Sequence, residues 1–156
     1  MLRIMFKIRE SILIGAKAEE IWPFVADPLL QKEWNTKIVS VDRHRTGPVT
    51  YGERYSMMFQ MGSTPLETEV EVIECDMYQN LTLEHRSVSK GKEQVATVNF
   101  QLVASENYVK VTQTLDFSGT RIPLIFRVLM WIINRLGKPV GQTNLEELRT
   151  LVGSKV

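Results

Sequence analysis

The feature that most constrains this chain is a series of alternating segments between Ile38 and Phe117. In the segment RYSMMFQM, residues 54–61, large apolar or aromatic side chains occupy every second position. A period of two is typical of a strand that buries one face. The segments are separated by short turn sequences, and short connections join antiparallel neighbours. These turn sequences are Thr46-Gly47-Pro48, Gly62-Ser63-Thr64-Pro65, Lys90-Gly91-Lys92 and Ser105-Glu106-Asn107. We therefore predict six antiparallel strands in this region.

The same alternation assigns side chains to the two faces of the predicted sheet. The inward sets consist mainly of aliphatic, aromatic and methionine side chains, and the outward sets carry most of the charge. We expect Phe59, Leu83 and Phe100 to be largely buried, and Glu67, Glu69 and Glu71 to be exposed on a solvated acidic row. The inward sets are Tyr55, Met57, Phe59 and Met61; Leu81, Leu83 and His85; Ala96, Val98, Phe100 and Leu102; and Val109, Val111, Gln113, Leu115 and Phe117.

The N-terminal sequence MLRIMFKIRESILIG predicts one more strand, because apolar residues occupy even positions, namely Leu2, Ile4, Phe6, Ile8, Ile12 and Ile14. A signal peptide would need an unbroken apolar run, so we expect this segment to remain in the mature protein. Glu10 interrupts the apolar face. A carboxylate directed into a core needs a partner, a water molecule or a changed pKa. A β-bulge that turns Glu10 outwards is the alternative.

Two short helices are predicted after this strand, in the sequence AKAEEIWPFVADPLLQKEW. Acidic residues Glu19 and Glu20 suit the first turn of a helix, and apolar residues follow at helical spacing. Pro23 removes a backbone donor and limits this helix. Asp27-Pro28 then predicts a turn, followed by a second helix towards Trp34.

The most apolar stretch of the chain is IPLIFRVLMWIINRLGKP, residues 122–139. Arg127 and Arg135 interrupt it, so it is too short to cross a bilayer, which takes ~20 mostly apolar residues. Its apolar residues form one helical stripe, and a second stripe through Gly141, Leu145, Leu148 and Val152 is out of phase with it. We predict a C-terminal helical region that is bent or broken near 137–139, where Gly137 and Pro139 lie.

Length, charge and cysteine content limit the number of domains, the kinds of partner and the cellular compartment. The 156 residues suit a single domain, 1–156, and 19 basic residues against 18 acidic ones leave a net charge of +1. We therefore expect no nucleic-acid partner. The single cysteine, Cys75, cannot form an internal disulfide, so a cytoplasmic location is expected.

Three stretches of the chain are similar to the START-like (SRPBCC) superfamily. They are SILIGAKAEEIWPFVADPLLQKEW, TGPVTYGERY and EVEVIECDMYQNLTLEHR, and their order and spacing carry the resemblance. The bacterial members are often labelled polyketide cyclase/dehydrase or lipid-transport proteins. The resemblance implies an α+β helix-grip fold, in which a seven-stranded antiparallel sheet wraps around a long C-terminal helix and encloses a cavity. The break near 137–139 departs from the family, whose last helix is commonly continuous.

Such a cavity would be lined by the inward side chains of the sheet and by the apolar stripe of the C-terminal region. Methionine and aromatic side chains can adapt to a bulky hydrophobic molecule, although residues with this spacing also simply fill a core. The predicted lining consists of Trp34, Tyr55, Met57, Phe59, Met61, Leu83, His85, Val98, Phe100, Gln113, Phe126, Leu129, Met130 and Ile133.

Polar groups are few on the predicted inward faces. His85, Glu10 and Tyr55 are the weak candidates for catalysis, and Gln113 is a further polar lining residue. His85 has three interpretations: a structural histidine, a donor that orients a ligand, or a catalytic acid or base. The sequence contains no metal-ligand spacing, phosphate-binding loop or dinucleotide fingerprint, so we expect no metal and no cofactor. The basic run through Arg43 is expected to be a solvated edge.

Two main classes of function remain open. The first is binding or transport of a small hydrophobic ligand, such as a lipid, an isoprenoid, a quinone or a polyketide. The second is a cyclase or dehydratase that uses the same cavity, which would need two convergent acid-base groups. A protein-interaction module is a third class. We expect 122–136 to gate the cavity and contact a membrane transiently through Trp131, with a homodimer interface or a plain core helix as the alternatives.

Overall fold

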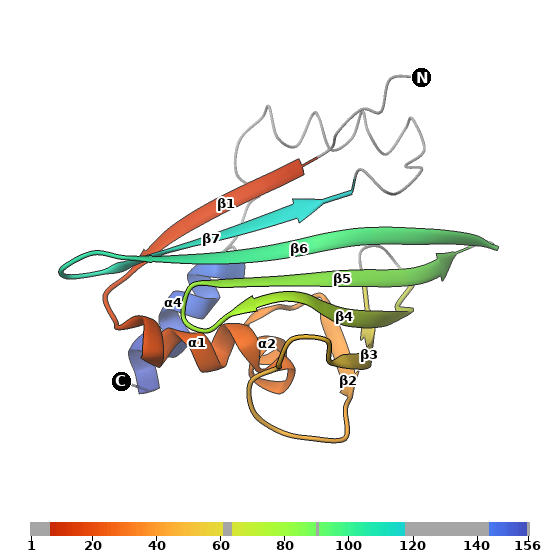
Figure 1. The fold of residues 1–156 in the computed structure, drawn as a ribbon, viewed down its shortest axis with the longest axis horizontal. Coiled ribbons are helices and arrows are strands. Elements are labelled where there is room, and N and C mark those ends of the chain that lie inside the picture. Colours follow the sequence, from red (N-terminus) through yellow and green to blue (C-terminus); the bar gives the residue numbers. More distant parts are fainter. Residues whose placement is uncertain (1–6, 61–63, 90, 118–143, 156) are drawn as a thin grey trace.

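The computed structural model describes residues 7–60, 64–89, 91–117 and 144–155, which form seven strands and three helices (Figure 1). Two short helices follow the first strand, and the last described helix is C-terminal to the whole sheet. The elements are β1 (Lys7–Ile14), α1 (Ala18–Ala26), α2 (Pro28–Trp34), β2 (Ile38–Asp42), β3 (Arg54–Phe59), β4 (Leu66–Asp76), β5 (Asn80–Ser89), β6 (Lys92–Ala104), β7 (Val109–Asp116) and α4 (Asn144–Lys155).

All seven strands belong to one antiparallel sheet with the order β1-β7-β6-β5-β4-β3-β2. Consecutive strands from β2 to β7 are neighbours, and β1 closes the order by pairing with β7. The three described helices lie on one side of this sheet (Figure 1). The prediction of an α+β helix-grip fold is confirmed.

The predicted faces of the central strands are also confirmed. Leu83 on β5 and Phe100 on β6 are buried, with 2% and 0% of their surfaces exposed, whereas Glu67 and Glu69 on β4 are exposed. Phe59 is only half-buried, which corrects the expectation that it would be largely buried. It lines unfilled space on the inward face of the sheet. Glu71 is likewise half-buried, and its carboxylate lies 3.4 Å from Arg54.

The two short helices meet at the turn predicted at Asp27-Pro28, and α1 continues through Pro23 to Ala26. The Asp27 carboxylate accepts a hydrogen bond of 3.0 Å from the backbone N–H of Leu29, and Pro28 occupies the first helical position of α2. Trp34, at the end of α2, donates its indole N–H to the carbonyl of Phe24 on α1 at 2.8 Å. Its ring also meets Phe100 edge-on, with centroids 6.0 Å apart. These contacts join both helices to the sheet.

The predicted second apolar stripe of the C-terminal region is confirmed within α4. Leu145, Leu148 and Val152 are each at most 2% exposed, so this helix packs its apolar face into the core. The expected gate at 122–136 and the expected break near 137–139 lie outside the described residues. None of the described helices is both long and apolar enough to cross a membrane.

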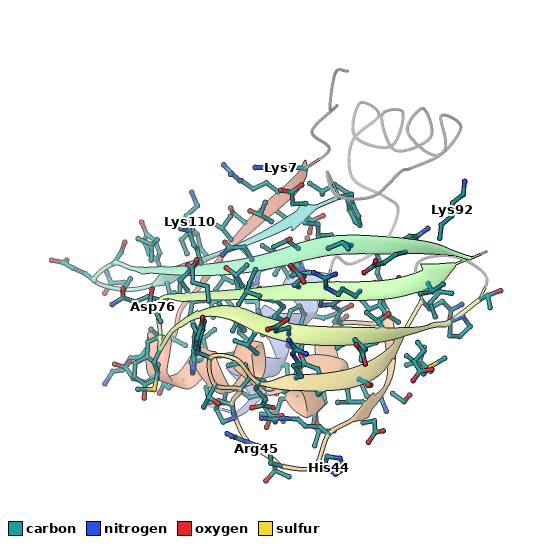
Figure 2. The ribbon with its side chains drawn as sticks, turned by 45° about the vertical axis from the view of Figure 1, so that its right-hand side comes forward. Lys7, His44, Arg45, Asp76, Lys92 and Lys110 are labelled. Atoms are coloured by element: carbon teal, nitrogen blue, oxygen red, sulfur yellow. The ribbon has the colours of Figure 1, made fainter. Side chains whose placement is uncertain are left out.

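One prediction about a charged segment was wrong. Arg43 is not part of a solvated edge, because its side chain is only 2% exposed. Its guanidinium donates two hydrogen bonds to the Glu53 carboxylate, at 2.6 and 3.1 Å, and a third to the carbonyl of Gly47. His44 and Arg45 do project outwards from the β2–β3 connection, as Figure 2 shows. Within the basic run, Arg43 is therefore buried, whereas His44 and Arg45 are exposed.

Candidate ligand-binding site

A hollow of about 240 Å³ lies between the inward face of the sheet and the ends of α2 and α4. We call it the inner hollow. Its apolar wall is formed by Ile8, Ile38, Phe59, Leu83, Val98, Phe100 and Leu115, and its polar lining by Glu10, Gln31, Asn35, Thr36, Lys37, His85, Gln113 and Asn144. Glu10 and Thr36 are exposed, so the inner hollow opens to solvent on their side.

A second space of about 100 Å³, the side hollow, adjoins the inner hollow. It extends along the inward faces of β4, β5 and β6, and residues such as Thr68 and Ala96 complete its lining. Both hollows share Lys37, Phe59, His85, Val98 and Leu115. Their combined volume lies just inside the lower end of the ~300–1,000 Å³ range of small-molecule pockets. The space therefore suits a small ligand.

His85 lies in the wall that the two hollows share. It is 9% exposed, and its Nε2 atom has no hydrogen-bond partner among the described residues. Burial lowers the pKa of His85 to about 4, because the charged imidazolium loses its hydration. The ring is therefore neutral at physiological pH. A buried polar atom without a partner is uncommon in native proteins and requires an explanation.

Glu10 and Gln113 lie opposite each other on the neighbouring strands β1 and β7. Directly opposed residues share a face, so both side chains belong to the inward face, as the alternation predicted. Gln113 is 9% exposed, whereas Glu10 is exposed to solvent at the open side of the inner hollow. The carboxylate of Glu10 is therefore not enclosed in a core.

Three predicted lining residues point inwards but border neither hollow. Trp34, Met57 and Tyr55 are buried in the core, at 0%, 2% and 6% exposure. Burial raises the pKa of the Tyr55 phenol, so this group stays protonated. Tyr55 pairs with Val70 on β4, and Val70 pairs with His85 on β5. The backbones of Tyr55 and His85 are therefore two strand spacings apart, a total of roughly 10 Å. The structure therefore does not bring these two candidates together.

Five other predicted lining residues lie outside the described residues, namely Met61, Phe126, Leu129, Met130 and Ile133. The described part of the predicted lining that does border the inner hollow consists of Phe59, Leu83, His85, Val98, Phe100 and Gln113.

Sequence reasoning missed the polar residues that join α2 to α4. The Asn144 side chain donates to the side-chain oxygen Oδ1 of Asn35 at 3.1 Å and accepts from the Thr36 hydroxyl at 3.3 Å. Lys37, the next residue, borders both hollows. Asn35, Thr36 and Lys37 lie in the connection between α2 and β2, and Asn144 is the first residue of α4. Hydrophobic periodicity does not assign a face to residues at such positions, so no sequence signal identified them.

A larger hollow of about 510 Å³ lies elsewhere, on the charged outer face of the sheet. Its lining includes Arg54, Glu71, Glu84 and Arg86. These groups already pair with one another, at 3.4 Å for Arg54–Glu71 and 2.6 Å for Arg86–Glu84. A surface of hydrated, mutually paired charges is poorly suited to a hydrophobic molecule. The two inward hollows are therefore the better candidate for a binding site.

Comparison with known proteins agrees with this architecture. A family model described as polyketide cyclase/dehydrase and lipid transport matches residues 5–153. The chain belongs to this family. The family match and the helix-grip fold also confirm the START-like resemblance. A search of curated proteins found no match. Membership indicates a role in binding hydrophobic molecules or in polyketide-related chemistry.

Solved structures of the same fold are distant in sequence. Protein CV1439 from Chromobacterium violaceum has 18% identity and a TM-score of 0.67, with 94% of this chain and 96% of that chain covered. A conserved protein from Geobacillus kaustophilus has 13% identity and a TM-score of 0.71, with 96% and 97% covered. DynU16, from the dynemicin biosynthetic locus, has 16% identity and a TM-score of 0.61, with 96% of this chain but 48% of that chain covered. These likenesses establish the fold.

Proposed function

We propose that this protein binds a small hydrophobic molecule in the inner and side hollows and carries it in that space. The observation that carries the proposal is the Nε2 atom of His85, which has no hydrogen-bond partner in the described part of the chain and belongs to a residue that borders both hollows with Phe59 and Val98. A ligand with one oxygen could pair with this atom while the remainder of the ligand contacts the aliphatic and aromatic side chains.

The energetics favour such an occupant. Leaving a buried polar atom without a partner costs about 1–3 kcal/mol, and a hydrogen bond from a ligand would remove this cost. Transfer of apolar ligand surface from water contributes roughly 25 cal/mol per Å². A neutral imidazole can serve as donor or acceptor through Nε2, depending on its tautomer. Lipids, isoprenoids, quinones and polyketides share the required combination of an apolar body and an oxygen.

A cyclase or dehydratase in the same space is the second candidate. It is supported by the presence of two titratable groups, His85 and Glu10, in the lining of one hollow. These groups would have to reach the same position of a substrate, because acid-base catalysis requires hydrogen-bond distance to the reacting atoms. Turnover of a polyketide-type substrate that is lost in both His85→Phe and Glu10→Gln would favour this candidate.

The test of ligand carriage is to identify what accompanies the protein. Wild-type protein is purified without detergent and extracted with organic solvent, and the extract is analysed by mass spectrometry. The variant Leu115→Trp, in which a large ring fills the shared wall, is treated in the same way. Val88→Trp is the matched control, because Val88 is 66% exposed.

We expect an apolar compound in the extracts of the wild type and Val88→Trp, and much less of it from Leu115→Trp. Circular dichroism of each variant establishes that the fold is retained. Equal extracts from all three proteins would contradict tight carriage in these hollows.

A further inference from the structure

Lys37 is placed at the shared boundary of both hollows by its backbone. Its N–H donates to the side-chain oxygen of Asn35 at 3.1 Å, and its carbonyl accepts from the N–H of Gln60 at 2.8 Å. These bonds hold the connection between α2 and β2 against the end of β3. The position from which the lysine side chain extends is therefore defined by the fold.

The charge of Lys37 has no ion-pair partner among the described residues. The residue is half-buried, and no carboxylate of a described residue lies within 4.0 Å of its ammonium group. Lys37 lines both hollows, and an ammonium group that exchanges water contacts for such a lining gains from a counter-ion. The other charged residue lining the inner hollow is Glu10, on the opposite edge strand, and it does not supply this counter-ion.

The apolar residues beside Lys37 indicate the form of the missing partner. Phe59, Val98 and Leu115 border the same two hollows, so an anion at Lys37 would be adjacent to an apolar wall. An inorganic anion would leave this wall without a contact. An amphiphile with an anionic head and a hydrocarbon tail would satisfy both the cation and the wall.

We propose that Lys37 binds the carboxylate of an amphiphilic acid whose tail lies along Phe59, Val98 and Leu115. This inference rests on the proposed function and specifies the class of ligand. A single cation matches the single charge of a carboxylate, whereas a phosphate monoester carries about −1.5 to −2 charges and needs more donors. Glu10 repels an anion only weakly, because it is exposed and its charge is screened by solvent and salt.

The experiment compares two ligands that differ only in the head group. Octanoic acid and 1-octanol have the same chain length, and only the acid is charged at neutral pH. Each is titrated into the ¹⁵N-labelled protein, and the dissociation constant is obtained from the amide chemical shifts. The variants are Lys37→Met, Lys37→Arg and Glu10→Gln. Lys37→Met retains a long apolar stem, and Lys37→Arg retains the charge.

We expect Lys37→Met to weaken octanoate binding by about tenfold, the size of a charge-assisted hydrogen bond, and to leave octanol binding unchanged. Lys37→Arg should keep most of the affinity for octanoate. Glu10→Gln should leave octanoate affinity unchanged or increase it slightly. This pattern would support a carboxylate site at Lys37.

Two results would overturn the inference, and they have different consequences for the proposed ligand carriage. In the first result, wild-type protein binds both ligands, and Lys37→Met either weakens the binding of both equally or changes neither. The head group then does not lie at Lys37, and the proposed ligand carriage stands. If wild-type protein binds neither ligand in the two hollows, the inference fails together with the proposal of a cavity for simple amphiphiles. The native-extract experiment on Leu115→Trp then decides separately whether the hollows carry another molecule.

Discussion

The imidazole ring of His85 on β5 meets the ring of Phe59 on β3 edge-on, with centroids 5.6 Å apart and planes at 86°. Only β4 separates these two strands in the sheet. An aromatic contact of this kind orients the imidazole by packing. The Nε2 atom has no partner in the part of the chain that the structure describes. The residue that carries this nitrogen borders both hollows, which is the position that a ligand-orienting group requires.

Replacing His85 with Phe should lower ligand affinity more than it lowers stability. An aromatic ring of similar shape removes one hydrogen bond to the ligand without opening a large cavity, so we expect about a tenfold loss of affinity. The free energy of unfolding should change by less than about 1 kcal/mol. Calorimetric titration with the extracted ligand and urea unfolding measure the two quantities. His44→Phe is the control, because His44 is exposed. Unchanged affinity in His85→Phe would assign His85 a structural role.

Stability should depend on pH through His85. The folded-state pKa is lowered by burial from 6.5 to about 4, so the unfolded chain binds a proton more readily than the folded protein between these values. The contribution of His85 is fully present above pH 6.5 and is lost as the pH falls towards about 4. The loss is about 3 kcal/mol for a shift of this size. Urea unfolding at several pH values should give a smaller decrease for His85→Phe than for the wild type. Parallel curves would show that His85 is not buried in its neutral form.

The buried Arg43, which pairs with Glu53, should stabilise the β2–β3 connection far more than the exposed Arg45 does. Burial by itself would raise the pKa of Glu53, but the hydrogen bond and charge of Arg43 lower it overall. Arg43→Met removes both guanidinium hydrogen bonds from the Glu53 carboxylate, leaves it only the exposed Arg45 at 3.6 Å and the Thr50 N–H at 3.4 Å, and should cost about 3–5 kcal/mol. Arg45→Met should cost about 0–1 kcal/mol, because the Arg45 side chain is 52% exposed. Urea unfolding of the two variants makes the comparison. Equal losses would contradict a buried role for Arg43.

The C-terminal helix should contribute to the same core as the sheet. Leu148 is fully buried, so Leu148→Ala should lower the free energy of unfolding by about 2–5 kcal/mol. Arg149, the next residue, is exposed, and Arg149→Ala should change it by about 0.5 kcal/mol or less. Chemical denaturation followed by tryptophan fluorescence gives both values. A small effect of Leu148→Ala would mean that α4 is not docked on the sheet in solution.

Local chemistry explains why the sequence predicted so much of the fold. The alternation in β5 and β6 specifies one buried face, and a shift of one residue would expose the whole apolar set. Asp27 and Pro28 specify the junction of α1 and α2 because both act on the backbone within two residues. Such signals need no knowledge of distant parts of the chain.

The environment of individual polar residues was predicted less well. Arg43 was misjudged because its partner, Glu53, is ten residues away and on the far side of a turn-containing connection. Nothing in the three-residue basic run distinguishes the buried arginine from the exposed one. Lys37 was missed for a related reason, since it follows α2 in a connection without periodicity and becomes part of the site only when β3 lies beside it.

The sequence by itself determined the class of fold, the faces of the central strands and the helix junction at Asp27. These properties depend on residue order and on interactions between near neighbours. Only the tertiary structure decided that a nitrogen of His85 has no partner among the described residues, that Tyr55 is separated from His85 by β4, and that Lys37 lines the same hollow as His85. The curvature of the sheet and the docking of α2 and α4 determine these distances, because residues far apart in the chain meet only after packing has excluded water between them.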